Sequence, residues 1–171
     1  MMLKLPLLKV TFYPFITLIF LGPLISYAGN FSAKVVHVID GDTVMVYDGT
    51  QQTKIRLYGI DAPESNQAFG QKSKDFMIKV AANRVVDIED HGQDVYGRTL
   101  GTIFLENKDL NGSIDLNGLM VYEGMAWTYR YHGRLIVPAY GALEKDARNT
   151  QRGLWADPHA IEPRQWRHKN D

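Results

Sequence analysis

Five short segments with the residue pattern of β-strands limit most strongly what this chain can fold into. β-Branched residues recur in them, and in several segments apolar and polar residues alternate with the period of a half-buried strand. The predicted strands are residues 33–40, 43–50, 53–60, 84–90 and 98–106. Turn-forming residues separate the first three strands, which are therefore expected to form a meander. The alternation slips near Gly101, which predicts a β-bulge.

Three further segments have helical periodicity. They span residues 66–82, 115–124 and 137–153. Ser65 or Asn66 is a candidate N-cap for the first helix. The chain from about residue 156 onward is predicted to be a loop-like tail in the same domain, with Trp155 and Trp166 as anchors.

The order of these elements indicates an α+β fold, and periodicity alone supports no finer statement. Because helices are inserted after the third and the fifth strand, the natural candidate is a five-stranded OB-fold β-barrel with three α-helices. A length of 171 residues and a hydrophobic content of 45% suit one domain with a single core.

The N-terminal segment has the layout of a secretory signal. Lys4 and Lys9 precede an apolar run, and Ser26 and Ala28 are small residues placed as in a cleavage site. The alternative is an uncleaved membrane anchor, but the run of about 16 residues is short for a span of about 20. We therefore expect residues 1–28 to be a signal peptide and residues 29–171 to be an exported domain, secreted or periplasmic, without stable membrane association.

Net charge and cysteine content limit the kinds of binding site and cross-link that the chain can form. Without residues 1–28, 17 Lys and Arg face 19 Asp and Glu, so the formal charge is −2. A nucleic-acid partner would therefore have to be held by a local positive patch or a metal ion, because no whole-protein positive field exists. The chain has no cysteine, which excludes a thiolate metal site and a disulfide framework. Nothing in the sequence indicates oligomerisation, so a monomer is expected.

Three clusters of charged residues lie at strand ends or in loops, where function is often located. They are "DGDT" at 40–43, "IRLYGIDAPE" at 55–64 and "DVYGR" at 94–98. Each has a simple structural explanation: the first as a turn, the second as an outward arginine before a rigid proline turn, the third as a loop with a surface ion pair. Taken together, these explanations do not account for the recurrence of acids with arginines.

A chemical explanation accounts for the three clusters jointly. Converging carboxylates repel one another unless a cation lies between them, and oxygen ligands favour Ca²⁺ or Mg²⁺. Nearby arginines would then face an anion bound to the metal, and the planar guanidinium group suits phosphate. A metal, two arginines and a further carboxylate are the groups needed to hydrolyse a phosphodiester.

The same residues resemble a known family. "VIDGDTV", "IRLYGIDAPE", "DVYGRTLG" and "LNGLMVYEGMAW", in this order, resemble the staphylococcal-nuclease-like (thermonuclease) family over about residues 33–156. The resemblance implies an OB-type barrel with three helices. It also implies Ca²⁺-dependent hydrolysis of DNA and RNA to 3′-phosphate ends.

The resemblance also implies roles for individual residues. Asp42 and Asp61 would bind Ca²⁺ through their carboxylates, and Ala62, where the family's type member has threonine, through its carbonyl. Glu64 would position or activate water. Arg56 and Arg98 would bind phosphate, and Tyr96 would lie near the terminal phosphate of a nucleotide, although Val95 replaces a lysine of the family pattern.

The sequence leaves undecided the roles of two aromatic residues and the choice between a nuclease and two other functions. Tyr129 and Tyr131 are candidates for base stacking, but Tyr131, like Trp127, could equally belong to the core. A catalytically weak OB-fold module that binds nucleic acid is the alternative to a nuclease. A hydrolase of small phosphate esters is a third, weaker option.

Overall fold

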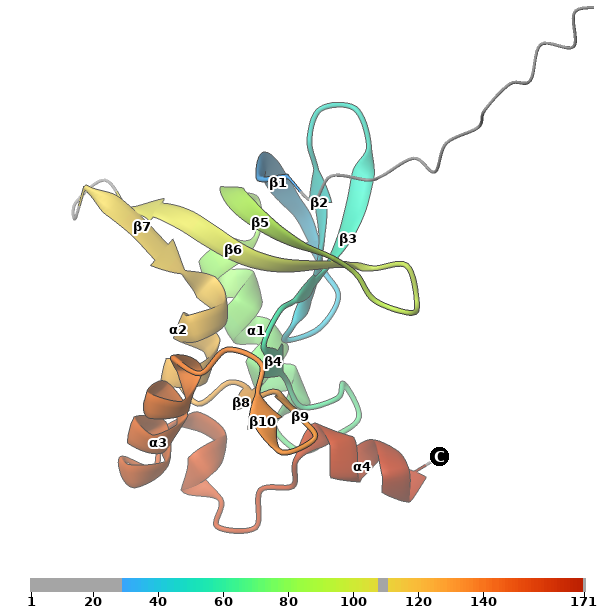
Figure 1. Ribbon diagram of the computed structural model, residues 1–171. Coiled ribbons are helices and arrows are strands. Elements are labelled where there is room, and N and C mark those ends of the chain that lie inside the picture. Colours follow the sequence, from blue (N-terminus) through green and yellow to red (C-terminus); the bar gives the residue numbers. More distant parts are fainter. Residues whose placement is uncertain (1–28, 108–110, 171) are drawn as a thin grey trace, which may run out of the picture.

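The computed structural model describes residues 29–107 and 111–170, which form an α+β fold with a large, mainly antiparallel sheet and four α-helices (Figure 1). The predicted signal peptide, residues 1–28, lies outside the described residues. Among the helices of the described part, none combines the length and apolar character that crossing a membrane requires.

The predicted meander is confirmed. The strands β1 (Phe31–Val38), β2 (Thr43–Tyr47) and β3 (Gln52–Leu57) pair as antiparallel neighbours. The sheet continues with β5 (Val85–Gln93), β6 (Thr99–Asn107) and β7 (Gly112–Asp115), in the order β3-β2-β1-β5-β6-β7. A parallel pairing of β3 with β6 brings the two predicted site segments, 55–64 and 94–98, side by side.

The core lies on the inner face of this sheet. Alternate strand positions are fully buried, as the period of two requires, and helices α1 (Gly70–Ala81) and α2 (Leu116–Tyr122) cover them from below in Figure 1. Burying an aliphatic side chain of this kind stabilises the fold by about 1.5–3 kcal/mol. The largest fully buried side chains include Val35, Val44, Ile55, Ile88, Ile103, Met77 and Met120.

The predicted irregularity near Gly101 falls on the partner strand. The register of β5 against β6 shifts between Asp90 and Gln93, opposite Thr99 to Gly101. Gly101 itself stays in the ladder, where an added Cβ would lie 2.9 Å from a methyl group of Ile55. The glycine is therefore required by close packing rather than by a bulge.

Three predictions about helices are wrong. Helix α1 begins at Gly70 instead of residue 66, because successive turns, Gln67 N–H to Glu64 C=O and Gly70 N–H to Gln67 C=O, occupy the preceding residues. Neither Ser65 nor Asn66 caps it. The tail is also not entirely loop-like: α4 (Pro163–Asn170) is a fourth helix, whereas three were predicted. Helix α3 (Tyr140–Asn149) is shorter than predicted.

A second, smaller core joins the C-terminal part of the chain to short strands below the sheet. Trp127 packs edge-on against Trp155 at 4.4 Å between ring centres, together with Leu154 of the 3-10 helix η1 (Gly153–Ala156). Trp155 is thus an anchor, as predicted. The short strands are β4 (Ile60–Asp61) paired with β8 (Trp127–Thr128), and β9 (Arg130–Tyr131) paired with β10 (Arg134–Leu135).

Candidate active site

All nine residues that the sequence singled out line one cavity of about 880 Å³. They come from four separate segments of the chain. The nine are Asp42, Arg56, Asp61, Ala62, Glu64, Tyr96, Arg98, Tyr129 and Tyr131.

The turn between β1 and β2 presents Asp42 to the cavity. Asp40 accepts a hydrogen bond from the Asp42 backbone N–H at 3.0 Å, which closes a tight turn. Gly41 is required because an added Cβ would lie 2.0 Å from the Ser73 hydroxyl oxygen. Asp42 Oδ2 accepts a hydrogen bond from the backbone N–H of Ala62 at 2.5 Å, so this turn is tied directly to the loop after β4.

Arg56, on β3, lies between two buried carboxylates. Its Nη1 is 2.7 Å from Asp42 Oδ2 and its Nη2 is 2.8 Å from Asp61 Oδ1. The side chains of Arg56, Asp42 and Asp61 are only 14%, 8% and 3% exposed. The sequence argument expected this guanidinium group to face an incoming anion, whereas in the structure it is the counter-ion of the two acids.

Burial dominates the electrostatics of Asp42. Loss of solvent raises the pKa of Asp42 to about 7, against the opposing effect of Arg56, while Asp40 and Asp61 raise it further. A carboxylate that resists ionisation in this way would be stabilised by any additional positive charge brought next to it.

The loop that carries Asp61 and Glu64 is shaped by Gly59. Gly59 has a φ of 77°, and an added Cβ would lie 2.5 Å from a methyl group of Val137. Asp61 is held in β4 by pairing with Trp127 of β8. Glu64, three residues further on, has a partly exposed side chain at the edge of the cavity.

Arg167 of α4 also lines this cavity, and the sequence analysis missed it. Its Nη1 lies 2.6 Å from Glu64 Oε1 and its Nη2 lies 2.9 Å from Asp61 Oδ2. The only sequence signal was weak: Pro163 is suited to the first turn of a helix, and an arginine follows one turn later.

The loop before β6 holds Arg98 and Tyr96. Arg98 donates from Nε to Asp94 Oδ2 at 2.7 Å, and its guanidinium group lies over the Tyr96 ring at 5.5 Å. Desolvation opposes ionisation of Asp94, but the hydrogen bonds from Arg98 and Tyr96 together outweigh it and lower the pKa of Asp94. The bonds to Asp94 use only some of the five N–H groups of Arg98, so the others are available to a ligand.

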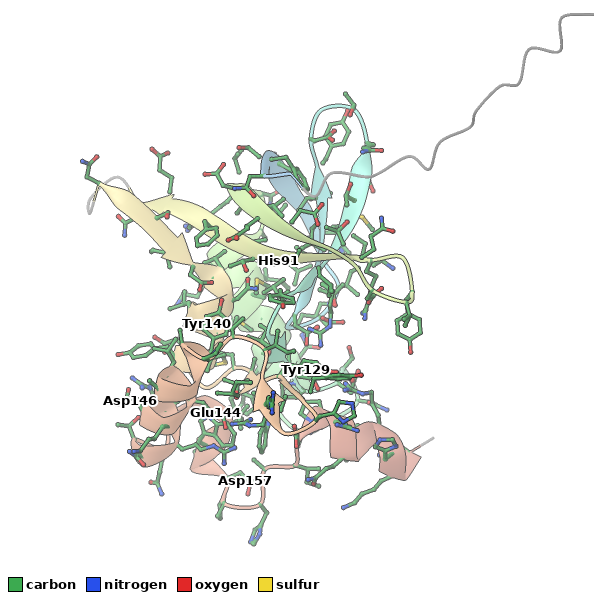
Figure 2. All side chains as sticks on the ribbon, viewed as in Figure 1. His91, Tyr129, Tyr140, Glu144, Asp146 and Asp157 are labelled. Carbon is green, nitrogen blue, oxygen red and sulfur yellow. The ribbon has the colours of Figure 1, made fainter. Side chains whose placement is uncertain are left out.

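The aromatic residues considered for stacking or for the core differ in how far they are buried. Trp127 is buried in the smaller core, whereas the Tyr131 side chain is exposed, at 59%, on the cavity rim. Tyr129 is half-buried and lies where the chain passes from β8 to β9, as Figure 2 shows. Tyr96 is also strongly exposed.

The donor set fits a hard divalent cation. The described residues contain no group of three or more His, Cys, Asp or Glu side chains that would hold a metal ion by themselves. Asp42 and Asp61 nevertheless converge on one positively charged guanidinium group, and all their donor atoms are oxygens. Carboxylate and carbonyl oxygens are the donors that hard divalent cations take in proteins, with water completing the shell.

Comparison with known proteins identifies the family. A family profile described as "Staphylococcal nuclease homologue" matches residues 54–157. The chain belongs to the staphylococcal nuclease family. The resemblance seen in the sequence is thereby confirmed, and the chain is a nuclease-type hydrolase.

Individual relatives are similar over most of their length. A protein named ParB from Escherichia coli is 42% identical over 142 residues, covering 81% of this chain and 80% of its own. A micrococcal nuclease from Shigella flexneri is 40% identical over 141 residues and 81% of each chain. An uncharacterised endonuclease from Haemophilus influenzae is 38% identical over 137 residues, covering 80% of this chain and 72% of its own.

Proposed function

We propose that this member of the staphylococcal nuclease family is an exported, calcium-dependent, sugar-nonspecific endonuclease that hydrolyses phosphodiester bonds in DNA and RNA and leaves 3′-phosphates. One observation carries the proposal: Asp42, Arg56, Asp61, Glu64 and Arg98, which are distant in sequence, line the same cavity. The strands β1, β2, β3, β5 and β6 pair in a ring that the pairing of β3 with β6 completes, and they would serve as an OB-type barrel beneath the site.

In this proposal Asp42, Asp61 and the carbonyl of Ala62 hold Ca²⁺. The bound ion would supply positive charge that stabilises the negative charge developing on the phosphate. Glu64 orients or deprotonates the attacking water, and its place at the cavity edge is compatible with either role.

Arg98 and Arg56 have different roles in this proposal. Arg98, at the mouth of the cavity, binds the phosphate with the N–H groups that Asp94 leaves free. Arg56 balances the buried acids and adds positive charge beneath the phosphate. Tyr96, Tyr129 and Tyr131 provide surfaces for the sugar and bases of a single strand.

The test is a digestion assay on purified residues 29–171. Plasmid, single-stranded DNA, RNA and p-nitrophenyl phosphate are incubated with Ca²⁺ and with a Ca²⁺ chelator. We expect cleavage of all three nucleic acids with Ca²⁺ only. The products should not prime a DNA polymerase until a phosphatase removes their 3′-phosphates.

Other outcomes identify the alternatives. Binding of nucleic acid without cleavage would indicate a catalytically weak binding module, and turnover of p-nitrophenyl phosphate alone would indicate a small-ester hydrolase. Export is tested separately, by fractionating cells that express the full chain or a form lacking residues 1–28. Equal retention of both forms inside the cell would contradict it.

A further inference from the structure

We propose that Arg167 is a positioning residue of the active site, which holds Glu64 and Asp61 in place for the reaction. This inference rests on the proposed function and extends it to the C-terminal helix. Arg167 Nη1 contacts Glu64 Oε1 at 2.6 Å and Asp61 Oδ1 at 3.2 Å, while Nη2 contacts Asp61 Oδ2 at 2.9 Å. One guanidinium group therefore joins the two carboxylates of the loop after β4.

Glu64 needs such a partner more than the other acids of the site. Asp42 and Asp61 are buried and are fixed by Arg56, whereas the Glu64 side chain is 36% exposed. Among the described residues, Arg167 is the ion-pair partner of Glu64. A carboxylate that acts on water must be held in one orientation, because small misplacements reduce rates strongly.

The tail that carries Arg167 is built into the same loop. The buried Gln67 side chain accepts from the Glu64 backbone N–H at 3.1 Å and donates to the Ile161 carbonyl at 2.6 Å. Next to Arg167, Trp166 Nε1 donates to Asn66 Oδ1 at 3.2 Å. Besides the ion pairs of Arg167, two hydrogen bonds thus join the Glu64 loop to the tail, and Gln67, which makes one of them, also holds the backbone of Glu64.

The charge balance of the site favours a productive role over an inhibitory one. Three carboxylates, of Asp42, Asp61 and Glu64, face two guanidinium groups, of Arg56 and Arg167. With a divalent cation these five side chains carry one net positive charge, which the nearby Asp40 carboxylate offsets. Without Arg167 the same groups would be one charge more negative and would stabilise the growing charge of the transition state less well.

The test compares variants of two arginines on α4. Arg167→Gln removes the charge but keeps a long polar side chain, and Arg167→Lys restores the charge without the planar fork. Arg164→Gln is the matched control, because Arg164 is an exposed arginine on the same helix. Each variant is measured for kcat and KM on single-stranded DNA, for thermal unfolding, and for amide hydrogen exchange in residues 61–67.

We expect Arg167→Gln to lower kcat by a factor on the order of 10 to 100, as for loss of one preorganised charged contact, with KM nearly unchanged. Exchange in the Glu64 loop should be faster than in the control, and Arg167→Lys should recover part of both effects. If Arg167 only stabilised the fold, the variant would not show a lower kcat with the same KM while its unfolding temperature stayed that of the unmodified protein.

Three results would overturn the proposal. The first is a folded Arg167→Gln variant with the same kcat as Arg164→Gln. The second is higher turnover, which would make the contact inhibitory. The third is unchanged exchange in residues 61–67. If the unmodified protein cleaves nothing, the proposed function fails, but the exchange comparison still decides whether Arg167 holds the loop.

Discussion

Two clusters of arginine and carboxylate groups, each with at least one acid almost fully shielded from water, are built in opposite ways. In the first, Asp42, Asp61 and Glu64 share Arg56 and Arg167 at the edge of a large cavity. In the second, a single acid, Glu144 of α3, is surrounded by donors (Figure 2).

Every part of the Glu144 carboxylate is used within the protein. Oε2 accepts from the backbone N–H of Thr128 at 2.9 Å, from the Thr128 hydroxyl and from Arg130, while Oε1 accepts from Arg148 Nε at 2.9 Å. Burial opposes ionisation, but the bonds from Thr128 and then those from the two arginines outweigh it, so the pKa of Glu144 is lowered. The pKa of Asp42, by contrast, is raised.

The contrast separates a structural ion cluster from a functional one. In the Glu144 cluster, cations outnumber the acid, and the carboxylate is ionised and fully hydrogen-bonded. In the cavity cluster, acids outnumber cations, and the effect of burial on Asp42 is not outweighed by Arg56, which leaves an attraction for one more positive charge. The ratio of acids to arginines and the open cavity distinguish the two, whereas the presence of ion pairs does not.

Arg56→Ala should have the largest effect, because it removes the shared counter-ion of the cavity cluster. Asp42 would lose its ion-pair partner and Asp61 would keep only Arg167. Loss of one partner of a buried ion pair typically costs about 3–5 kcal/mol of stability, and activity should fall to background. Arg98→Ala is the comparison: its side chain is more exposed and paired at the surface, so kcat should fall by a factor on the order of 10² with little loss of stability. Urea unfolding and steady-state kinetics measure both; equal stability losses would contradict the distinction.

Glu64→Gln should lower kcat by a factor on the order of 10² or more, the usual scale for loss of one charged catalytic contact, and should leave the fold intact. The amide keeps the length of the side chain and can still meet Arg167, so the change isolates the negative charge. Circular dichroism and kinetics on single-stranded DNA provide the measurement. A variant with full activity would remove Glu64 from the mechanism.

Glu144→Gln tests the opposite cluster and should affect stability instead of turnover. Loss of hydrogen bonds to a charged group costs about 1.5–3 kcal/mol, while kcat per folded molecule should stay near that of the unmodified protein. Because the folded-state pKa of Glu144 is lowered, its ionised form contributes stability above the ordinary value of 4.5. That contribution is lost as the pH falls through the folded-state pKa.

Unfolding measurements at pH 7 and in acid check this sign. The difference in unfolding free energy between Glu144→Gln and the unmodified protein should be largest at neutral pH and should shrink as the pH falls below about 4.5. A difference that grew in acid would mean that the cluster stabilises the protonated form.

Local patterns account for what the sequence could predict. Strands such as β3, in which Ile55 and Leu57 are buried, could be predicted because apolar and polar residues alternate along the local sequence. The candidate site residues could be singled out because Asp42 and Arg98 lie in loops, and Asp61 in a two-residue strand just before a proline, where the local sequence is distinctive. The strand β7 escaped because four residues, Gly112–Asp115, carry too short a pattern to detect.

Arg167 and the counter-ion role of Arg56 could not be predicted, for a different reason. Helix α4 is polar around most of its surface, so it lacks the apolar stripe by which amphipathic helices are recognised. The partners of Arg167 lie about a hundred positions earlier in the chain. That Arg56 pairs with two acids depends on the meeting of three separate segments, which only the folded chain defines.

The smallest effect on activity is expected for Tyr131, which lines the cavity but belongs to neither ion cluster. Tyr131 is exposed, and its ring contacts only His132 edge-on among the ring pairs of the described residues, at 4.2 Å between centres. Tyr131→Ala should raise KM for single-stranded DNA about fivefold, the lower end of the value of one stacked base, with kcat and stability unchanged. Tyr131→Phe should retain normal KM, since stacking needs the ring and not the hydroxyl. Tyr47→Ala, at an exposed tyrosine outside the cavity lining, is the control, and an equal change in KM there would mean that Tyr131 does not contact the strand.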